Sequence, residues 1–325
     1  MKKWLAVLTG AVGLSVASAQ AAETYPNRPI TWIVPFAAGG PTDGMARSIA
    51  HKVSQELGQN ILIENVGGAG GTIGAIKASR SKPDGYTFLV GHIGYMAAAP
   101  SLYKQLAYSP TEDFKAVFRF PDTPLVMLTG ANSPHQNIDQ LIDFAKKNPG
   151  QLNFSNAGIG STSHLVAAMF ASRAGIEIMP ISYKGAGPAL NDLMGGQVDA
   201  MFDQTNTALP QTKGGKVRAL ALTSATEMPQ FPNVPTLASK AIPKFEVSTW
   251  YGIYAPKDTP DEAIQTLYKA YTRVLEDQAF TKQMTDQGIV LLPADQITPE
   301  AFQAFTADEV KKWRAVIKDA GITPQ

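Results

Sequence analysis

One stretch, Ile30–Arg47, constrains the fold of this 325-residue chain more than any other. Within it, Thr31–Val34 is rich in the β-branched and aromatic residues that are typical of a short buried strand. Pro35 follows directly, and a proline cannot donate a hydrogen bond within a central sheet ladder. The pattern therefore predicts a strand that ends abruptly at a turn.

That turn leads into the start of a helix. Gly39 and Gly40 allow the backbone to turn tightly, and Thr42 or Asp43 can cap a helix that runs to about Leu57. A strand, a glycine turn and a helix N-terminus together present converging backbone N–H groups, which favour a bound anion. From this stretch alone, an ordinary tight connection between a strand and a helix explains the pattern equally well.

The same arrangement recurs later in the chain. Asn153–Ser155 predicts a short strand, which opens into the glycine- and hydroxyl-rich segment Asn156–Ser163 and then into a helix from His164 to about Ala174. Two helix starts of this kind indicate an anion site more strongly than either does alone.

The first 21 residues have the pattern of an export signal. Met1–Lys3 is positively charged, Trp4–Val16 is apolar, and Ala19–Ala21 forms a small-residue cleavage pattern. The apolar run is shorter than the roughly 20 residues that a membrane-spanning helix needs. We therefore expect a cleavable signal peptide and a periplasmic protein.

Composition excludes several classes of function. Lys and Arg number 28 against 27 Asp and Glu, so the chain lacks the basic excess of a nucleic-acid-binding protein. It contains no Cys, which excludes a disulfide scaffold and Cys-ligated metals. Four histidines, His51, His92, His135 and His164, lack the spacing of metal ligands. We expect a monomer without cofactor, metal or nucleic-acid partner.

Strands and helices alternate along the rest of the chain, which predicts an α/β fold whose sheets are mostly parallel and flanked by helices. Two irregular segments, Phe120–Pro124 and Phe231–Pro243, suggest crossovers between two lobes. We assign residues 22–121 plus 244–325 to lobe 1 and residues 122–243 to lobe 2, with a ligand cleft between them. Other predicted strands and helices are Ile61–Glu64, Tyr86–Val90, Leu125–Thr129, Ile138–Lys147 (helix), Met179–Ser182, Pro188–Met194 (helix), Val198–Phe202, Val217–Leu222, Val247–Ala255 and a helix after the capping box Thr259–Glu262.

Because each lobe contributes one helix start, the expected ligand is a small carboxylate held by backbone N–H groups and hydroxyls rather than by an arginine. Arg47 lies about a turn beyond the first helix start and suits a surface ion pair. Lys184 could meet a second carboxylate, although exposed loop lysines are common. The predicted loop Gly91–Tyr95 offers His92 and Tyr95 as wall residues, or else as a structural His and a packed Tyr.

Two other chemistries are disfavoured. The glycine-rich segment Asn65–Gly74 lacks the Lys-Ser/Thr of a P-loop and the glycine spacing of a dinucleotide site. An exported hydrolase could use Ser161 or Ser163 with His164, but the chain has no Gly-x-Ser-x-Gly, and adjacent side chains on a helix point apart.

Several spaced motifs together resemble a known family, the Bug-type substrate-binding proteins of tripartite tricarboxylate transporters, also called TctC-like. The resemblance covers essentially all of the chain after residue 21. Its motifs are Pro35–Gly40 with Asp43 and Arg47, Glu64–Asn65, Pro83–Thr87, Gly158–Leu165, Tyr183–Gly185, Gly196–Asp199 with Met201–Asp203, and Val234–Thr236.

The resemblance implies a two-lobed periplasmic binding protein of type II that closes on its ligand, without enzymatic activity. It also implies a membrane permease of one large and one small subunit as partner, although a ligand sensor for a signalling partner remains an alternative. In the family, loops that match Phe36–Asp43 and Gly158–His164 hold the ligand carboxylate, and Asp203 matches a position near the cleft. The predicted ligand-binding residues are Phe36, Ala37, Ala38, Gly39, Gly40, Thr42, Asp43, His92, Tyr95, Ser155, Asn156, Gly160, Ser161, Thr162, Ser163, His164, Gly185 and Asp203.

Overall fold

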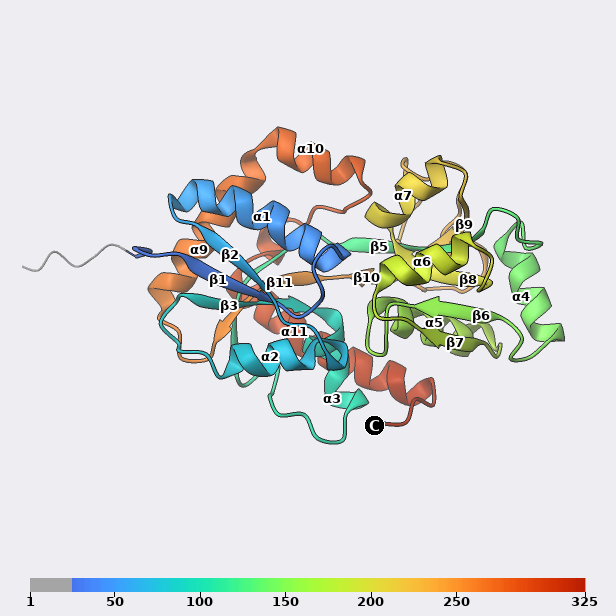
Figure 1. Ribbon diagram of the computed structural model, residues 1–325, viewed down its shortest axis with the longest axis horizontal. Helices are drawn as coiled ribbons and strands as arrows, with labels where there is room; N and C mark the ends of the chain where they lie inside the picture. The colour runs from blue at the N-terminus through green and yellow to red at the C-terminus, as the bar shows by residue number, and fades with distance from the viewer. Residues whose placement is uncertain (1–24, 325) are drawn as a thin grey trace, which may run out of the picture.

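The strands assemble into two sheets that lie side by side along the long axis of the molecule (Figure 1). The computed structural model describes residues 25–324, so the predicted signal peptide lies outside the described residues. Helices pack on both sheets, which confirms the α/β architecture expected from the alternating pattern.

The first sheet combines the N-terminal strands with one strand from the C-terminal part of the chain. Its order is β2-β1-β3-β11-β4 within the described residues. β1 pairs in parallel with β2 and β3, whereas β11 is antiparallel to β3 and β4. The strand bounds are β1 Ile30–Val34, β2 Ile61–Asn65, β3 Thr87–His92, β4 Phe114–Arg119 and β11 Tyr251–Pro256.

The second sheet is built mainly from the middle of the chain. Its order in the part that the structure describes is β10-β5-β8-β6-β7, with β9 also paired to β5. β6 is parallel to β7 and β8, whereas β5 runs antiparallel to β8, β9 and β10. The bounds are β5 Thr123–Gly130, β6 Asn153–Asn156, β7 Met179–Ser182, β8 Ala200–Gln204, β9 Val217–Leu222 and β10 Ser248–Thr249.

Both sheets are thus mixed, and the expectation of mostly parallel pairing holds only for part of each. The antiparallel strands β5 and β11 are those that enter a sheet directly from the other one. Parallel neighbours in a sheet are joined by a helical crossover. A strand that arrives from the other sheet has no such crossover before it, so it can run antiparallel.

The chain passes between the sheets at residues 120–122 and again at Trp250. These crossings lie together, because the backbone N–H of Phe120 donates to the carbonyl of Tyr251 at 2.9 Å. The single strand expected over Val247–Ala255 is therefore wrong. Its residues divide into β10 and β11, which belong to different sheets, and β10 extends the second sheet beyond residue 243.

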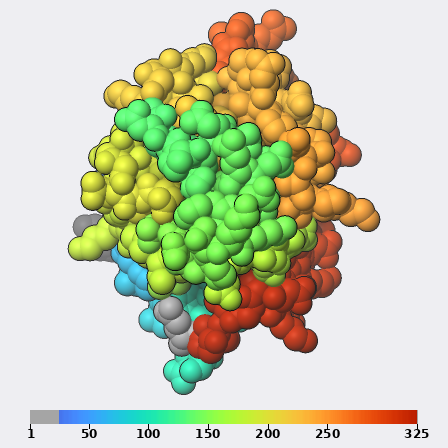
Figure 2. Space-filling model, turned by 90° about the vertical axis from the view of Figure 1, so that its right-hand side faces the viewer, coloured from blue at the N-terminus to red at the C-terminus, as the bar shows by residue number. Residues whose placement is uncertain are grey.

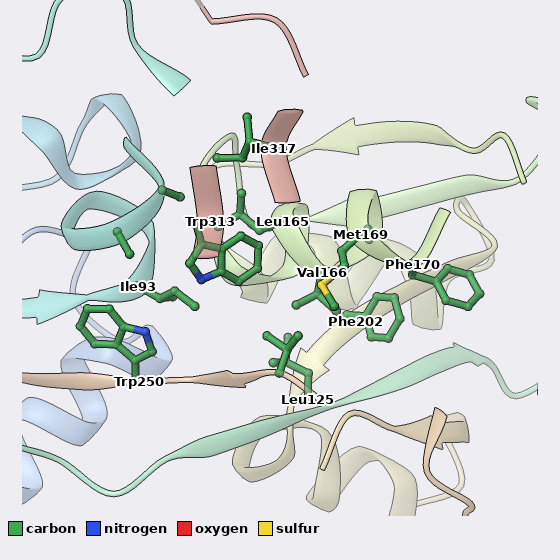
Figure 3. Packing of buried hydrophobic residues seen from close by; sticks show 14 of the residues in the cluster. Ile93, Leu125, Leu165, Val166, Met169, Phe170, Phe202, Trp250, Trp313 and Ile317 are labelled. Carbon is green, nitrogen blue, oxygen red and sulfur yellow. The ribbon is translucent and has the colours of Figure 1, made fainter. Parts of the chain in front are cut away.

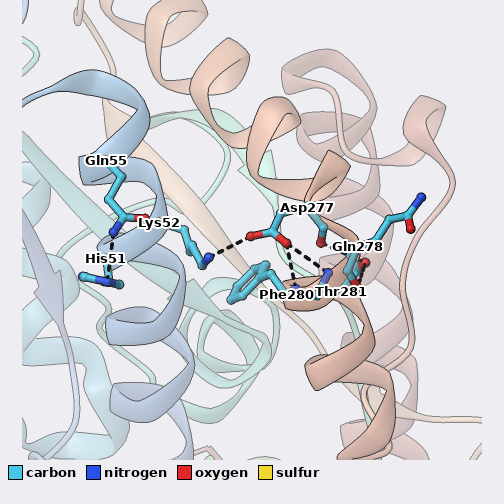
Figure 4. Close-up of polar contacts among 8 residues, drawn as sticks. His51, Lys52, Gln55, Asp277, Gln278, Phe280 and Thr281 are labelled. Atoms are coloured by element: carbon cyan, nitrogen blue, oxygen red, sulfur yellow. Dashed lines mark hydrogen bonds and ion pairs between the residues drawn. The ribbon is translucent and has the colours of Figure 1, made fainter.

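Helices α1, α9 and α10 stand together over the first sheet. Lys52 of α1 bonds Asp277 Oδ2 through Nζ at 2.7 Å, and the other carboxylate oxygen of Asp277 accepts the backbone N–H groups of Ala279 and Phe280 at the start of α10 (Figure 4). These hydrogen bonds hold the pKa of Asp277 below its ordinary value.

The helices on this sheet are α1 Pro41–Leu57, α2 Thr72–Ser79, α3 Ala99–Leu102, α9 Asp261–Glu276, α10 Gln278–Asp286 and α11 Pro299–Asp319, and those of the second sheet are α4 Ile138–Lys147, α5 Thr162–Ala174, α6 Ala186–Met194, α7 Thr205–Lys213 and α8 Leu237–Lys240.

The capping box expected before α9 is not formed. The helix begins at Asp261 with Pro260 as its N-cap and no side-chain cap hydrogen bond. The hydroxyl oxygen of Thr259 is buried without a hydrogen-bond partner among the described residues.

One apolar core spans the junction between the sheets. Trp313 and Ile317 of the long helix α11 lie beside Leu165 and Met169 of α5, close to the crossing residue Trp250 (Figure 3). Seen from the end that carries the second sheet, the C-terminal segment in red lies against green segments of the middle of the chain (Figure 2). Helix α11 therefore packs on the first sheet at β4 and on helix α5, which belongs to the second sheet, and so braces one half of the molecule against the other.

Candidate binding site between the two sheets

A cavity of about 330 Å³ opens between the two sheets, close to where the chain crosses from one to the other. Twelve of the residues predicted from the sequence line it, drawn from both sheets. They are Phe36, Ala37, Ala38, Gly39, Gly40, Thr42, His92, Ser161, Thr162, Ser163, Gly185 and Asp203.

The start of α1 forms one wall, although its cap differs from the expectation. Gly40 is the N-cap and Pro41 occupies the first turn, so neither Thr42 nor Asp43 caps the helix. Asp43 does not line the cavity, and its carboxylate accepts the backbone N–H of Gly39 and the side chain of Arg47, each at 2.9 Å.

This carboxylate holds the loop in shape through its hydrogen bonds. Asn65 Nδ2 also donates to it, at 2.9 Å. Burial raises the pKa of Asp43, but the hydrogen bonds from Arg47, Gly39 and Asn65 outweigh burial, so the pKa lies below its ordinary value. The half-exposed Arg47 forms the surface ion pair expected for it.

The start of α5 forms the facing wall. Ser161 is the N-cap, and its hydroxyl accepts the backbone N–H of His164 at 3.3 Å. The hydroxyl of Ser163 accepts the backbone N–H of Ala157 at 2.9 Å, which fixes the preceding loop.

The hydrolase alternative finds no support in this arrangement. His164 does not line the cavity, and its Nδ1 is buried without a hydrogen-bond partner among the described residues. Burial lowers the pKa of His164. Neither Ser161 nor Ser163 therefore has a base within hydrogen-bonding reach of its hydroxyl in residues 25–324.

Two further helix starts reach the cavity; the sequence predicted Gly185 and Asp203 as binding residues there, but neither helix start as an anion site, and helix α7 was not predicted. Gly185 is the N-cap of α6, with Ala186 and Gly187 in its first turn, and Gln204 is the N-cap of α7. Like α1, neither helix has a side-chain cap hydrogen bond. The positive ends of four helices therefore converge on one cavity, and in α1 and α6 no side chain caps the first-turn N–H groups.

Topology explains this convergence. Each of these helices follows a strand directly: α1 follows β1, α5 follows β6, α6 follows β7 and α7 follows β8. Because β6, β7 and β8 are mutually parallel, their carboxyl ends lie at one edge of the sheet and their helices start there. This edge is where open α/β sheets commonly bind ligands.

Two ionisable residues complete the lining. Asp203, at the end of β8, is only 3% exposed, and burial raises its pKa to about 6 against the hydrogen bonds from Thr207 and from the backbone of Gln204. Lys184 lies in the loop before α6 and forms no ion pair with another residue of the described chain. The cavity thus has one buried acid and one exposed cation at its wall.

Aromatic rings close the side of the first sheet. His92 is the last residue of β3, and Phe36 packs edge-on against it with ring centroids 5.2 Å apart. Tyr95 stacks behind His92 at 5.6 Å and does not line the cavity, so for this residue the packed alternative holds. The expected loop at Gly91–Tyr95 is wrong, since β3 continues through His92 and a π-helix, Gly94–Ala98, follows.

Three other predicted residues support the site from behind without lining it. The hydroxyl of Ser155 donates to the carbonyl of Ala189 at 3.5 Å, and Asn156 Oδ1 accepts the backbone N–H of Gly158 at 2.9 Å. Gly160 takes a φ of +80° at the turn into α5. Lys184, which the sequence offered as a partner for a second carboxylate, lines the cavity, and the lining residues that the prediction did not name are Pro41, Leu125, Ala157, Ala186, Gly187, Pro188, Phe202 and Gln204.

The fold and the site geometry agree with comparisons to known proteins. Residues 45–322 match the family described as "Tripartite tricarboxylate transporter family receptor". The chain belongs to this family. The family consists of substrate-binding receptors rather than enzymes, so the resemblance found in the sequence motifs is confirmed.

Solved structures of the family superpose closely on this chain. The periplasmic binding protein BugD is 41% identical, with a TM-score of 0.86 over 93% of this chain and 100% of its own. MatC (Rpa3494) from Rhodopseudomonas palustris, solved with bound malate, is 34% identical, with a TM-score of 0.85 over 90% and 100%. R. palustris Rpa4515, solved with adipate, is 32% identical, with a TM-score of 0.87 over 93% and 100%.

Between residues 25 and 324, none of the helices combines the length and the apolar character that a bilayer crossing requires.

Proposed function

We propose that this tripartite tricarboxylate transporter receptor captures a small organic carboxylate in the cavity between its sheets. In this proposal the protein acts in the periplasm and delivers the ligand to a membrane permease of one large and one small subunit. Family membership supports the receptor role, and the relatives solved with malate and with adipate support a carboxylate as ligand.

The observation that carries the proposal is the convergence of four helix starts on one cavity. Each helix start contributes about half a positive charge and several N–H donors, so a buried anion is stabilised there without an arginine. A neutral ligand gains little from these partial charges, and a cation is repelled by them. An organic acid is therefore the ligand class that the lining favours.

The two ionisable lining residues suggest how the ends of the ligand differ. Lys184 offers a second carboxylate a partner at the cavity mouth, where an adjoining cavity of about 590 Å³ begins. The glycine-rich loop of residues 67–71 lines this second cavity. A dicarboxylate with one end at the helix starts and the other at Lys184 fits this arrangement.

Calorimetric titration with malate, succinate, adipate and benzoate tests the proposal. We expect at least one acid to bind with a Kd near the micromolar range, about −8 kcal/mol. The matched control is the corresponding amide of each acid, which has a similar shape but no charge. The proposal fails if none of the acids binds, or if the amides bind as well as the acids.

A pair of glycine substitutions tests whether the start of α1 holds the ligand. Gly39 (φ +83°) lines the cavity, whereas Gly58 (φ +65°) ends the same helix away from the cavity, and an added Cβ would meet nothing within 4 Å at either. Alanine at either position should cost about 1 kcal/mol of folding stability, because both require a left-handed backbone. Only Gly39→Ala should also weaken binding. Equal affinity in the two variants would contradict the proposed grip.

Closure and delivery need separate experiments. We propose that the lobes, residues 25–121 plus 251–324 and residues 122–249, hinge about the two chain crossings, so that ligand decreases the radius of gyration in small-angle scattering. Uptake of the bound acid by cells should require both this receptor and a permease. Uptake that persists without the receptor would separate binding from delivery.

A further inference from the structure

His92 is held in one orientation at the seam between the two sheets. It ends β3, is only 3% exposed and lines the cavity. Besides Phe36, the rings of Tyr95 and Tyr251 pack against it, with centroids 5.6 Å and 5.4 Å away. The imidazole therefore cannot turn over without displacing three aromatic side chains.

The hydrogen bonds of His92 fix the position of its proton. The backbone N–H of Gly94 donates to Nδ1 at 2.9 Å, so Nδ1 must be an acceptor. Burial lowers the pKa of His92 to about 3, so the ring is neutral at physiological pH. A neutral ring whose Nδ1 accepts must carry its proton on Nε2. Nε2 lies 3.1 Å from the Oγ1 of Thr162, to which it donates.

Thr162 then has one hydrogen left to donate. It is the first residue of α5, is 3% exposed and lines the cavity. Among the described residues, His92 is the hydrogen-bond partner of its hydroxyl. Because Oγ1 accepts from His92, the hydroxyl hydrogen must point to a different acceptor, and the open direction is the cavity.

We propose that His92 is a positioning residue that orients the hydroxyl of Thr162 as a hydrogen-bond donor to the ligand carboxylate. This inference rests on the proposed function. The series runs from the Gly94 N–H through the imidazole to Thr162 and on to the ligand, and each bond polarises the next. It also bridges the sheets, since His92 belongs to the first and Thr162 to the second.

The close approach of the sheets supports this arrangement. A Cβ at Gly94 would collide with the backbone carbonyl of Gly160, in the turn that leads into α5. Residue 94, whose backbone N–H donates to His92 Nδ1, must therefore be a glycine. The same close approach brings the imidazole within reach of Thr162.

A double-mutant cycle tests the inference with malate and adipate as probes. His92→Phe keeps a ring in the aromatic cluster but removes both hydrogen bonds, and Thr162→Val removes the hydroxyl. Each variant should weaken binding about tenfold or more, because each removes an oriented hydrogen bond to a charged group. The double variant should be no weaker than either single one, and His92→Gln, which retains a donor, should restore part of the affinity.

His135→Phe is the matched control. His135 is also buried, packs on Phe144 at 4.8 Å and does not line the cavity. Its replacement should leave binding of both probes unchanged. Additive losses in the cycle, or normal binding by His92→Phe, would overturn the inference. If the wild-type protein binds no carboxylate at all, the proposed function fails instead.

Nitrogen NMR of the imidazole tests the tautomer without any ligand. We expect the His92 signals to show Nε2–H and an unprotonated Nδ1, unchanged between about pH 5 and pH 8. A proton on Nδ1, or titration within this interval, would refute the positioning role. This measurement remains decisive even if His92→Phe does not fold.

Discussion

The buried carboxyl group of Asp203 predicts a pH dependence of stability that a single substitution removes. Burial raises its pKa from 3.8 to about 6, and the hydrogen bond from Thr207 Oγ1, 2.7 Å long, only partly compensates. Between these two values the folded protein binds the proton of this group more tightly than the unfolded chain does. Stability must therefore fall as pH rises from about 4 to about 6, and it must remain lower above that window.

The magnitude follows from the shift. About two pKa units at roughly 1.4 kcal/mol each amount to about 3 kcal/mol of folding free energy lost when the buried group ionises. Asn has nearly the same shape as Asp and retains an oxygen that accepts the Thr207 hydroxyl, but it cannot ionise. Asp203→Asn should thus be more stable than the wild type by about 3 kcal/mol near pH 7 and equally stable near pH 4.

Urea unfolding of both proteins across this pH range measures the difference directly. Burial also raises the pKa of Asp122 to about 6, but its contribution is common to both proteins and cancels in the comparison. Asp139→Asn, at an exposed position on helix α4, which packs on the same sheet as Asp203, is the control for loss of a carboxylate. A stability difference between Asp203→Asn and the wild type that does not vary with pH would refute the reasoning.

Three further predictions concern the adjoining cavity, the ligand and the brace between the sheets. Gly70→Ala places a Cβ 2.8 Å from the carbonyl oxygen of Ile159 across the seam, so it should hinder closure and enlarge the ligand-bound radius of gyration in scattering. Lys184→Gln should weaken adipate binding in calorimetry about fivefold while changing benzoate binding little, since a monocarboxylate lacks the second charge. Glu309→Ala should lower stability in urea by about 3 kcal/mol, because it leaves the indole N–H groups of Trp250 and Trp313, now bonded at 2.8 Å and 3.0 Å, without an acceptor.

Local sequence patterns predicted a helix or strand correctly where a single pattern covers the whole element. The helix Ile138–Lys147 and the strands Met179–Ser182 and Val217–Leu222 have the bounds that the sequence indicated. In α4, apolar residues at helical spacing and an Asn N-cap agree with the fold around them. Such elements are predictable because local preference and tertiary packing favour the same conformation.

The secondary-structure predictions fail where tertiary contacts, rather than local sequence, determine which helix or strand forms. Val247–Ala255 has a continuous β pattern, yet its two ends pair with different sheets, and no local signal marks the break at Trp250. Helix α7 was not expected, since it contains Pro210 and several β-branched threonines that have low helix propensity. Its contacts with β5, β8 and β9 stabilise it in spite of its sequence.

The candidate site shows which part of a binding site can be read from a sequence. Glycine turns revealed the starts of α1 and α5, because glycine is needed there for the backbone geometry. The starts of α6 and α7 carry no such pair of turn and hydroxyl cap, yet they face the same cavity. A topological rule would have found them: β6, β7 and β8 are each followed by a helix, and parallel strands end at a common edge. The anion preference that we propose for the cavity would therefore be a property of strand order, to which individual side chains such as Lys184 and Asp203 would add selectivity.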